Sequence, residues 1–315
     1  MIYLQLVASL GLLLVGGELL VRGAVAIARR LGTSDLMIGL TLVGFGTSTP
    51  ELVTSLDAAL VGAPGIAVGN VVGSNIANIL LILGVGALIM PMHTTREAFR
   101  RDGPVLLGAS VLLVGACVLE VIPRAVGALF LALLLAYTCY TYWTERAATN
   151  ASAAMHAAEA DALGRVPGGP GTALAGALGG LAAVLIGASL LVEAAIGIAQ
   201  TWGVSDAVIG LTIVAIGTSL PELATTVVAA FRRQPDVAFG NIVGSNIFNI
   251  LGILGTTTLV APLAVPASIA GFDVWVMLAA AIVGSGFAMS GWRVNRLEGG
   301  LLLLAYLGYL LLVVG

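Results

Sequence analysis

Ten stretches of predominantly apolar residues constrain this chain more than any other feature, because each can form a helix that crosses a bilayer. A crossing helix needs about 20 such residues. The stretches lie at 3–28, 34–60, 66–90, 104–122, 124–143, 172–200, 206–230, 237–260, 271–290 and 298–314. Only 9% of the residues are charged, whereas a soluble domain carries about 25%. The sequence therefore predicts an all-α integral membrane protein with ten transmembrane helices. It excludes a soluble enzyme, a nucleic-acid-binding protein and a disordered regulator.

The arginines predict the orientation of these helices, because cytoplasmic connections of membrane proteins are enriched in basic residues. Alternate connections hold eleven arginines, and the opposite set holds only Arg124. The basic connections carry Arg29, Arg30, Arg96, Arg100, Arg101, Arg146, Arg165, Arg232, Arg233, Arg293 and Arg296. We therefore expect both termini on the outer side of the membrane. Short loops without a targeting segment favour a prokaryotic cytoplasmic (inner) membrane.

The longest connection, 144–171, is rich in alanine and glycine and ends in a run of proline and glycine. This composition is typical of a flexible linker. We expect it to lie in the cytoplasm, between a first half at 1–143 and a second half at 172–315, each with five transmembrane stretches.

The two halves repeat each other at a constant offset of 171 residues (222 − 51 = 171). GTSTPEL at 46–52 matches GTSLPEL at 217–223, and GNVVGSNIANIL at 69–80 matches GNIVGSNIFNIL at 240–251. Because each half has an odd number of spans, the second must be inverted relative to the first. Inverted repeats with interrupted helices are typical of alternating-access transporters.

The repeated motifs are expected to interrupt the second, third, seventh and eighth helices and to form a central ion site there. Pro50 and Pro221 each lack a backbone donor and clash with the carbonyl four residues earlier. Carbonyls near Gly44 and Ala215 are thereby freed, which is tolerated inside a membrane only where they face protein, water or an ion.

Side chains with oxygen atoms gather in the same motifs. Threonine and glutamate four residues apart share one face of a helix. The candidate ligands are the side chains of Glu51, Glu222, Thr47, Thr218, Ser48, Ser219, Ser74, Ser245, Asn78 and Asn249. Oxygen ligands suit hard cations such as Ca²⁺, and the absence of His and Cys from these motifs argues against zinc, copper and iron. Two intramembrane carboxylates without a basic partner in their motifs require a cation or a proton.

Other polar residues are interpreted as structural. Any single Ser, Thr or Asn here can serve helix packing alone. Asn70 and Asn241 are expected to cap helix starts rather than to bind ions. Glu18 and Arg22, four residues apart, are expected to pair with each other.

On these motifs, present in two full copies, the chain resembles the sodium/calcium exchanger family of the cation/calcium antiporter superfamily. The resemblance implies a ten-helix inverted-repeat fold and exchange of three Na⁺ for one Ca²⁺ at four central sites. It implies that Glu51, Glu222, Thr47 and Thr218 bind Ca²⁺. It also implies that Ser48, Ser74, Ser219, Ser245 and the carbonyls near Gly44 and Ala215 bind Na⁺, with Asn78 and Asn249 lining the middle of the pocket.

The resemblance further implies a transporter rather than an enzyme, with Ca²⁺ and Na⁺ as transported ions and no cofactor. The surroundings are the lipid bilayer; no nucleic acid and no obligate protein partner are expected, and a monomer is possible. Some microbial members and the potassium-dependent branch carry Asp at the position of Asn249, so the asparagine disfavours potassium co-transport.

Three alternatives remain from the sequence. A proton/calcium exchanger would titrate the two glutamates, but a proton needs no cage of hydroxyl groups. A cation channel would not need a two-fold inverted repeat. An intramembrane hydrolase would need a nucleophile with a base or a paired-Asp site, and no stretch contains His or a suitable pair of Asp residues.

Overall fold

The computed structural model describes residues 2–30, 45–147, 170–231, 233 and 235–314, and the statements below concern these residues. The expected stretch at 34–60 is thus described only from residue 45. Most of the expected linker at 144–171 lies outside the described residues, as does Gly44.

Helices occupy all the expected transmembrane stretches to the extent that these are described. These helices are predominantly apolar. Such a helix is stable where it contacts other helices or lipid rather than water. The α-helices of the first half are α1 (Ile2–Arg30), α3 (Thr49–Leu60), α4 (Pro64–Ala77), α5 (Leu83–Ile89), α6 (Arg96–Cys117) and α7 (Arg124–Ala147). Those of the second half are α9 (Pro170–Trp202), α10 (Asp206–Ile209), α11 (Ala215–Thr218), α12 (Leu220–Phe231), α13 (Pro235–Phe248), α14 (Gly255–Val260), α15 (Val274–Met289) and α16 (Arg296–Val314).

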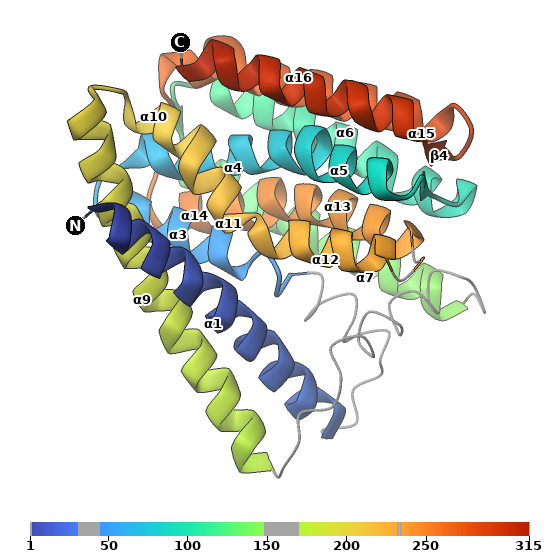
Figure 1. The fold of residues 1–315 in the computed structure, drawn as a ribbon, viewed down its shortest axis with the longest axis horizontal. Coiled ribbons are helices and arrows are strands. Elements are labelled where there is room, and N and C mark those ends of the chain that lie inside the picture. Colours follow the sequence, from blue (N-terminus) through green and yellow to red (C-terminus); the bar gives the residue numbers. More distant parts are fainter. Residues whose placement is uncertain (1, 31–44, 148–169, 232, 234, 315) are drawn as a thin grey trace.

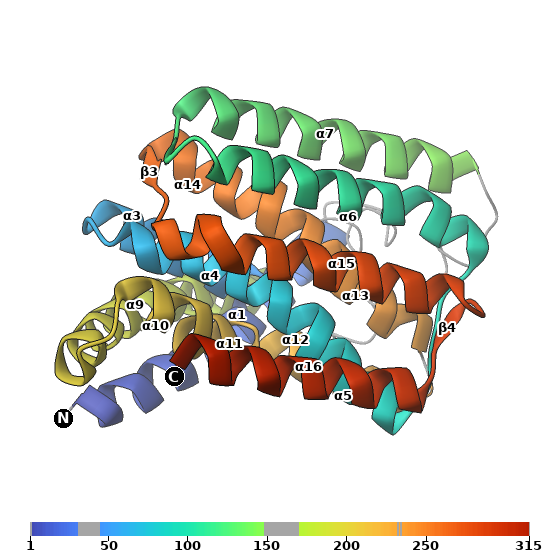
Figure 2. The same ribbon diagram turned by 90° about the horizontal axis from the view of Figure 1, so that it is seen from above.

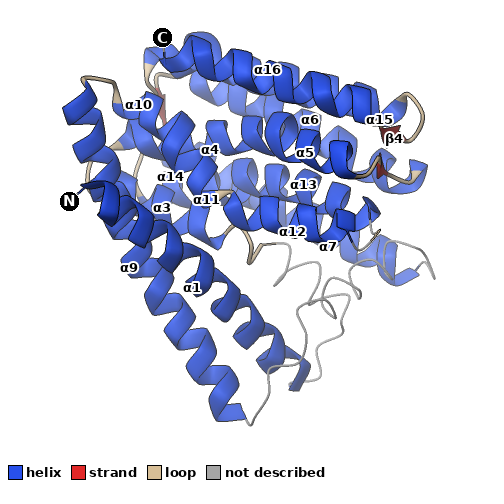
Figure 3. Ribbon diagram, viewed as in Figure 1, coloured by secondary structure: helices blue, strands red, loops and turns tan. Residues whose placement is uncertain are grey.

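Short π-helical segments and strands complete the described elements. The π-helical segments are η2 (Asn78–Ile82), η3 (Gly210–Val214), η4 (Asn249–Leu254) and η5 (Ile269–Asp273). The strands are β1 (Met92–His93), β2 (Val121–Ile122), β3 (Leu263–Ala264) and β4 (Arg293–Val294). Figure 3 shows that the described chain is otherwise almost wholly helical.

Among the described residues, seven helices are long and apolar enough to cross a membrane, and eight if the bent pair α10–α12 counts as one span. The helix α6 is not among them, because its first two turns carry several charged residues, from Arg96 to Asp102. The prediction of a multi-pass integral membrane protein is confirmed. By length and composition, seven or eight of the ten expected spans can be recognised among the described residues.

The centre of the bundle is formed by α4–η2–α5 and α13–η4–α14, whose membrane windows are 78% and 83% buried. By contrast, α7 and α16 lie at the periphery, with 17% and 22% of their windows buried. In Figures 1 and 2 the start of α1 and the end of α16 lie at the same end of the bundle. The helices α1 and α9 pack along each other at an angle to the rest (Figure 1).

Glycines allow α1 and α9 to approach closely. A Cβ atom on Gly23 would lie 2.5 Å from the backbone nitrogen of Ala177, so no larger residue fits without moving a helix. On α1, Arg22 Nε donates to Glu18 Oε1, which confirms the predicted pair.

The expected interruptions differ between the repeated motifs. The chain bends by 43° between α11 and α12, next to Pro221, and residues 45–48 form turns before α3 begins with Pro50 in its first turn. The third and eighth spans contain no such bend; the helix continues through the π-helical segments η2 and η4, where breaks were expected. A π-helical turn frees backbone groups locally without ending the helix.

Matched contacts tie the two halves together at both ends of the bundle. At one end β1 pairs with β4, and at the other β2 pairs with β3, both antiparallel. The strands correspond between halves: β1 lies 171 residues before β3, and β2 lies 172 before β4. Each half thus contributes the same two strands to opposite ends.

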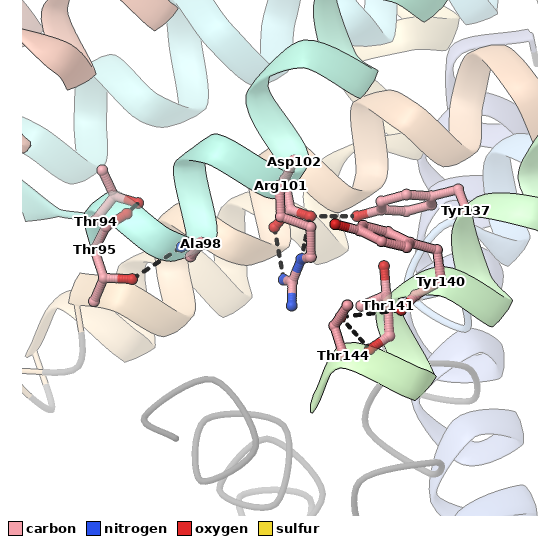
Figure 4. Close-up of polar contacts among 9 residues, drawn as sticks. All are labelled: Thr94, Thr95, Ala98, Arg101, Asp102, Tyr137, Tyr140, Thr141 and Thr144. Atoms are coloured by element: carbon pink, nitrogen blue, oxygen red, sulfur yellow. Dashed lines mark hydrogen bonds and ion pairs between the residues drawn. The ribbon is translucent and has the colours of Figure 1, made fainter. Parts of the chain in front are cut away.

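A phenol–carboxylate bond is also repeated, partly buried in the first half and buried in the second. Figure 4 shows Tyr137 of α7 donating to Asp102 of α6, and the oxygen atoms Tyr137 Oη and Asp102 Oδ1 are 2.9 Å apart. In the second half Tyr309 of α16 donates to Asp273 of η5 at the same distance. These bonds connect neighbouring helices within each half.

Candidate cation site

Two buried glutamates form the centre of the candidate site. Glu51 lies in the first turn of α3 and Glu222 in the first turn of α12, with exposed fractions of 1% and 0%. Within the described part of the chain neither acid forms an ion pair. The two carboxyl groups interact electrostatically with each other. Two acids without a base therefore face one buried region.

Serines from the opposite half hold each carboxylate. Ser48 Oγ donates to Glu222 Oε1 at 2.7 Å, and Ser219 Oγ donates to Glu51 Oε1 at 3.1 Å. Ser48 and Ser219 occupy matched positions, so the same bond is made twice with the halves exchanged. Ser245 of α13 joins this group, because Ser48 Oγ lies 3.4 Å from its hydroxyl oxygen.

Several buried oxygens of the site have no hydrogen-bond partner among the described residues. These atoms are Glu51 Oε2, Glu222 Oε2, Thr47 Oγ1, Asn78 Oδ1 and Asn249 Oδ1. An unpaired buried polar group costs about 1–3 kcal/mol, and more if charged. A cation among these atoms would remove that cost, because all of them can donate electron pairs to it.

Thr218 and Ser74 lie in the same polar region, and the hydroxyl groups of both lie near the Ala215 carbonyl oxygen. Thr218 Oγ1 lies 3.0 Å from the Val214 carbonyl oxygen, 3.4 Å from that of Ala215 and 3.0 Å from Asn70 Oδ1, and its single hydrogen is donated to one of them at a time. Ser74 Oγ lies 3.5 Å from the Ala215 carbonyl oxygen, which places this predicted carbonyl ligand beside Ser74. Of the predicted ligands, only Gly44 lies outside the described residues.

The interpretation of Asn70 and Asn241 as helix caps is wrong. The residue before α4 is Ala63, and Asn70 lies inside that helix, fully buried; Asn241 likewise lies inside α13. Asn70 Nδ2 donates to the Glu51 carbonyl oxygen at 3.2 Å, and Asn70 Oδ1 accepts from Thr218 Oγ1 at 3.0 Å. Asn70 therefore joins the two halves. Its position in the duplicated motif, four residues before Ser74, was the signal that it faces the site.

The chemistry of the site is that of oxygen atoms. The described residues contain no group of three or more His, Cys, Asp or Glu that could hold a metal ion. The donor set instead combines two carboxylates with hydroxyls, amides and a carbonyl, which suits a hard cation such as Ca²⁺ or Na⁺ rather than a softer transition metal.

Comparison with known proteins identifies the family. The sequence profile described as "Sodium/calcium exchanger protein" matches residues 1–143 and 172–315. The chain belongs to the sodium/calcium exchanger family. It is 41% identical to CaxA of Alkalimonas amylolytica, named as an antiporter, over 96% of this chain and 95% of that protein. It is 36% identical to the sodium/calcium exchanger MaX1 of Methanosarcina acetivorans, over 99% and 98% of the two chains.

A solved structure agrees with this membership. A structure of the sodium-calcium exchanger NCX_Mj superposes with a TM-score of 0.64, covers 99% of each chain and is 31% identical in sequence. Members of the sodium/calcium exchanger family are transporters, and antiport of Ca²⁺ against another cation is the function that the family supports. The resemblance based on the duplicated motifs is confirmed.

Proposed function

We propose that this exchanger couples entry of Na⁺ to exit of Ca²⁺ by alternating access, with three Na⁺ exchanged for one Ca²⁺. One observation carries the proposal: two buried carboxylates without a base, each bonded to a serine of the opposite half. Two such charges in a low-dielectric interior repel each other, so a bound cation is needed to stabilise the pair.

The charge balance supports the stoichiometry. Glu51 and Glu222 together carry a charge of −2 when ionised, which one Ca²⁺ neutralises, whereas three Na⁺ leave a surplus of +1. Moving one net charge across the membrane is worth about 2.3 kcal/mol per 100 mV. A negative interior therefore favours Na⁺ entry coupled to Ca²⁺ exit.

We assign the ligands as follows. Glu51, Glu222, Thr47 and Thr218 hold Ca²⁺, and Asn78 and Asn249 line the middle of the pocket. Na⁺ is held by Ser48, Ser74, Ser219, Ser245 and the carbonyls of Gly44 and Ala215. The unpartnered buried oxygens of Glu51, Glu222, Thr47, Asn78 and Asn249 support this assignment. Shared ligands would prevent both ions from binding together, as antiport requires.

The proposed architecture has ten spans in two inverted halves, 1–143 and 172–315, joined by a cytoplasmic linker at 144–171. The matched strand pairs at opposite ends support the inversion. From the distribution of arginines we place both termini outside the cytoplasmic membrane. In this proposal the protein is not an enzyme, needs no cofactor and works without an obligate partner.

Proton/calcium exchange is the nearest competing function. The hydroxyl groups around the acids favour sodium, because a proton transferred to a carboxylate needs no further oxygen ligands. Potassium-dependent exchange is disfavoured by Asn249, which is neutral where that branch carries a carboxylate.

The test is ⁴⁵Ca²⁺ uptake into vesicles containing the purified chain. A Na⁺ gradient should drive uptake, and a pH or K⁺ gradient alone should not. Valinomycin-clamped voltage should change the rate if net charge moves. Uptake driven only by pH would refute sodium coupling, and ion currents far above carrier turnover would indicate a channel.

A further inference from the structure

The polar network around Asn70 is closed. Its Nδ2 donates to the Glu51 carbonyl oxygen at 3.2 Å and to Ser55 Oγ at 2.9 Å, and its Oδ1 accepts from Thr218 Oγ1 at 3.0 Å. A carbonyl oxygen can only accept, so the amide orientation is fixed. We call this group the first latch. It ties α3 and α4 to α11 of the other half.

The matched group in the second half is open. An offset of 171 relates Asn70 to Asn241, Ser55 to Thr226 and Thr47 to Thr218. Among the described residues, Asn241 Nδ2, Thr226 Oγ1 and Thr47 Oγ1 have no hydrogen-bond partner. We call Asn241, Thr226, Thr47 and the Glu222 carbonyl the second latch. The same four groups are thus present in both halves but bonded in only one.

The two latches lie on opposite sides of the acids. Asn70 is in the first half of α4, which begins beside the start of α10. Asn241 is in the first half of α13, which follows the end of α12. In Figure 1 α10 lies toward one end of the bundle and the end of α12 toward the other.

Asn70 and the glycines beside it are also more buried than the matched residues of the second half. Asn70 is 0% exposed and Asn241 9% exposed. Gly69 and Gly73 beside the first latch are buried, whereas the matched Gly240 and Gly244 are partly exposed. A Cβ on Gly73 would lie 2.6 Å from the Leu211 carbonyl oxygen, so α4 packs tightly against the seventh span. The bonded latch therefore coincides with the more tightly closed side.

Neighbouring positions show that this difference is specific. Asn75 Nδ2 donates to the Val71 carbonyl, and the matched Asn246 Nδ2 donates to the Ile242 carbonyl, at 2.8 and 2.7 Å. These bonds stay within one helix and are the same in both halves. Only the asparagines whose partners lie on other helices differ.

We propose that Asn70 and Asn241 are alternating latches: Asn70 closes one side of the site in the state seen here, and in the opposite access state it releases while Asn241 bonds Thr226, Thr47 and the Glu222 carbonyl. This rests on the proposed function, because only an alternating-access carrier needs two such states. Both residues act by positioning helices, not by binding ions.

A cysteine at Ala207 provides the test. Ala207 lies at the tight contact between α10 and α4, 2% exposed, so it becomes reactive only when the first side opens. The full-length chain carries Ala207→Cys, with Cys117 and Cys139 replaced by alanine. Its labelling rate with a hydrophilic maleimide is measured in detergent, in buffer without Na⁺ or Ca²⁺.

The two latch variants should change the rate in opposite directions. Asn70→Ala should raise it about tenfold, because losing two or three buried hydrogen bonds shifts the equilibrium by roughly that factor. Asn241→Ala should lower it, because the opposite state loses its latch. Asn75→Ala is the matched control and should leave the rate unchanged. A general loss of stability could raise labelling but could not lower it.

Milder variants keep the test decisive if Asn70→Ala does not fold. Ser55→Ala should raise the labelling rate and Thr226→Ala should lower it, both by about threefold. Two results would overturn the proposal. One is a labelling rate that changes equally in the first-latch variant and the matched second-latch variant. The other is a labelling rate that does not fall in Asn241→Ala or Thr226→Ala. ⁴⁵Ca²⁺ flux of the parent chain is measured separately. Opposite labelling shifts without sodium-driven flux would reject sodium/calcium exchange and leave the latches standing.

Discussion

The two glutamates make equivalent hydrogen bonds in the two halves, whereas within the described chain the two asparagines do not. All four residues nevertheless belong to the same duplicated motifs. The serine–glutamate bonds are made in both directions, from Ser48 to Glu222 and from Ser219 to Glu51. Among the residues that the structure describes, the bonds of Asn70 have no equivalent at Asn241. The two glutamates and the serines that bond them are thus arranged alike in both halves. Residues proposed to close the path to the ions are not, as expected if only one side is closed at a time.

The largest expected effect is on the symmetric pair. Glu51→Gln and Glu222→Gln should each reduce sodium-driven ⁴⁵Ca²⁺ uptake to background, because one remaining charge cannot neutralise a Ca²⁺ ion. Because the two glutamates make equivalent bonds, the two variants should lose uptake to the same extent. Glu97→Gln, which changes an exposed carboxylate at the start of α6, is the control and should keep parental uptake. Parental flux in either site variant would remove that acid from the proposed site.

A smaller effect is expected for the serines that hold the acids. Ser48→Ala and Ser219→Ala each remove one hydrogen bond to a carboxylate. Both serines are also proposed Na⁺ ligands, and a charge-assisted contact of this kind contributes about 1.5–3 kcal/mol, so the apparent Na⁺ affinity should fall roughly 10- to 100-fold. A Na⁺ titration of ⁴⁵Ca²⁺ uptake measures this. Thr225→Ala is a suitable control, since within the described part of the chain its hydroxyl bonds only the Pro221 carbonyl of α12. Very unequal losses for the two serines would show that the crossed bonds are not equivalent in function.

These results bear on what the sequence alone could predict. The duplicated motifs, with their glutamates and serines, predicted the family and brought the right residue types together. The pairing of Ser48 with Glu222 rather than with Glu51 depends on how the halves pack, and no local pattern encodes it. The role of Asn70 was missed for the same reason: a polar residue near the start of an apolar stretch looks like a cap, because the helix boundary at Pro64 is uncertain from sequence.

The interruptions were partly predictable. Pro221 correctly indicated a distortion, because a proline in a helix removes a hydrogen bond wherever it lies. The third and eighth spans contain glycines but no internal proline. Glycine lowers helix stability without forbidding the helix, and buried neighbours keep these helices continuous through η2 and η4.

The two phenol–carboxylate bonds should contribute differently to the stability of the protein. Asp102 also pairs with Arg101, at 2.6 Å from its Nε, whereas Tyr309 is the one side chain in the described residues that donates to Asp273. Tyr309→Phe should therefore destabilise the chain by about 1–3 kcal/mol and Tyr137→Phe by about 1 kcal/mol. The midpoint of thermal unfolding in detergent measures both. Tyr140→Phe, an exposed change on α7, is the control. Equal shifts would mean that Arg101 contributes nothing to holding Asp102.

The smallest expected effect concerns a helix cap present in only one half. Thr95 Oγ1 accepts from the backbone nitrogen of Ala98 at 3.1 Å and caps α6 (Figure 4). The matched residue is Pro266, which has no side-chain acceptor, and η5 begins without a side-chain cap. Thr95→Ala should cost about 1 kcal/mol of stability, and Thr95→Ser, which keeps the acceptor, should cost much less. Neither should alter calcium uptake, because the hydrogen bond of the cap involves only Thr95 and Ala98 and no residue of the proposed cation site. A change in uptake without a change in stability would instead mean that asymmetry at the helix ends, and not only at Asn70 and Asn241, governs transport.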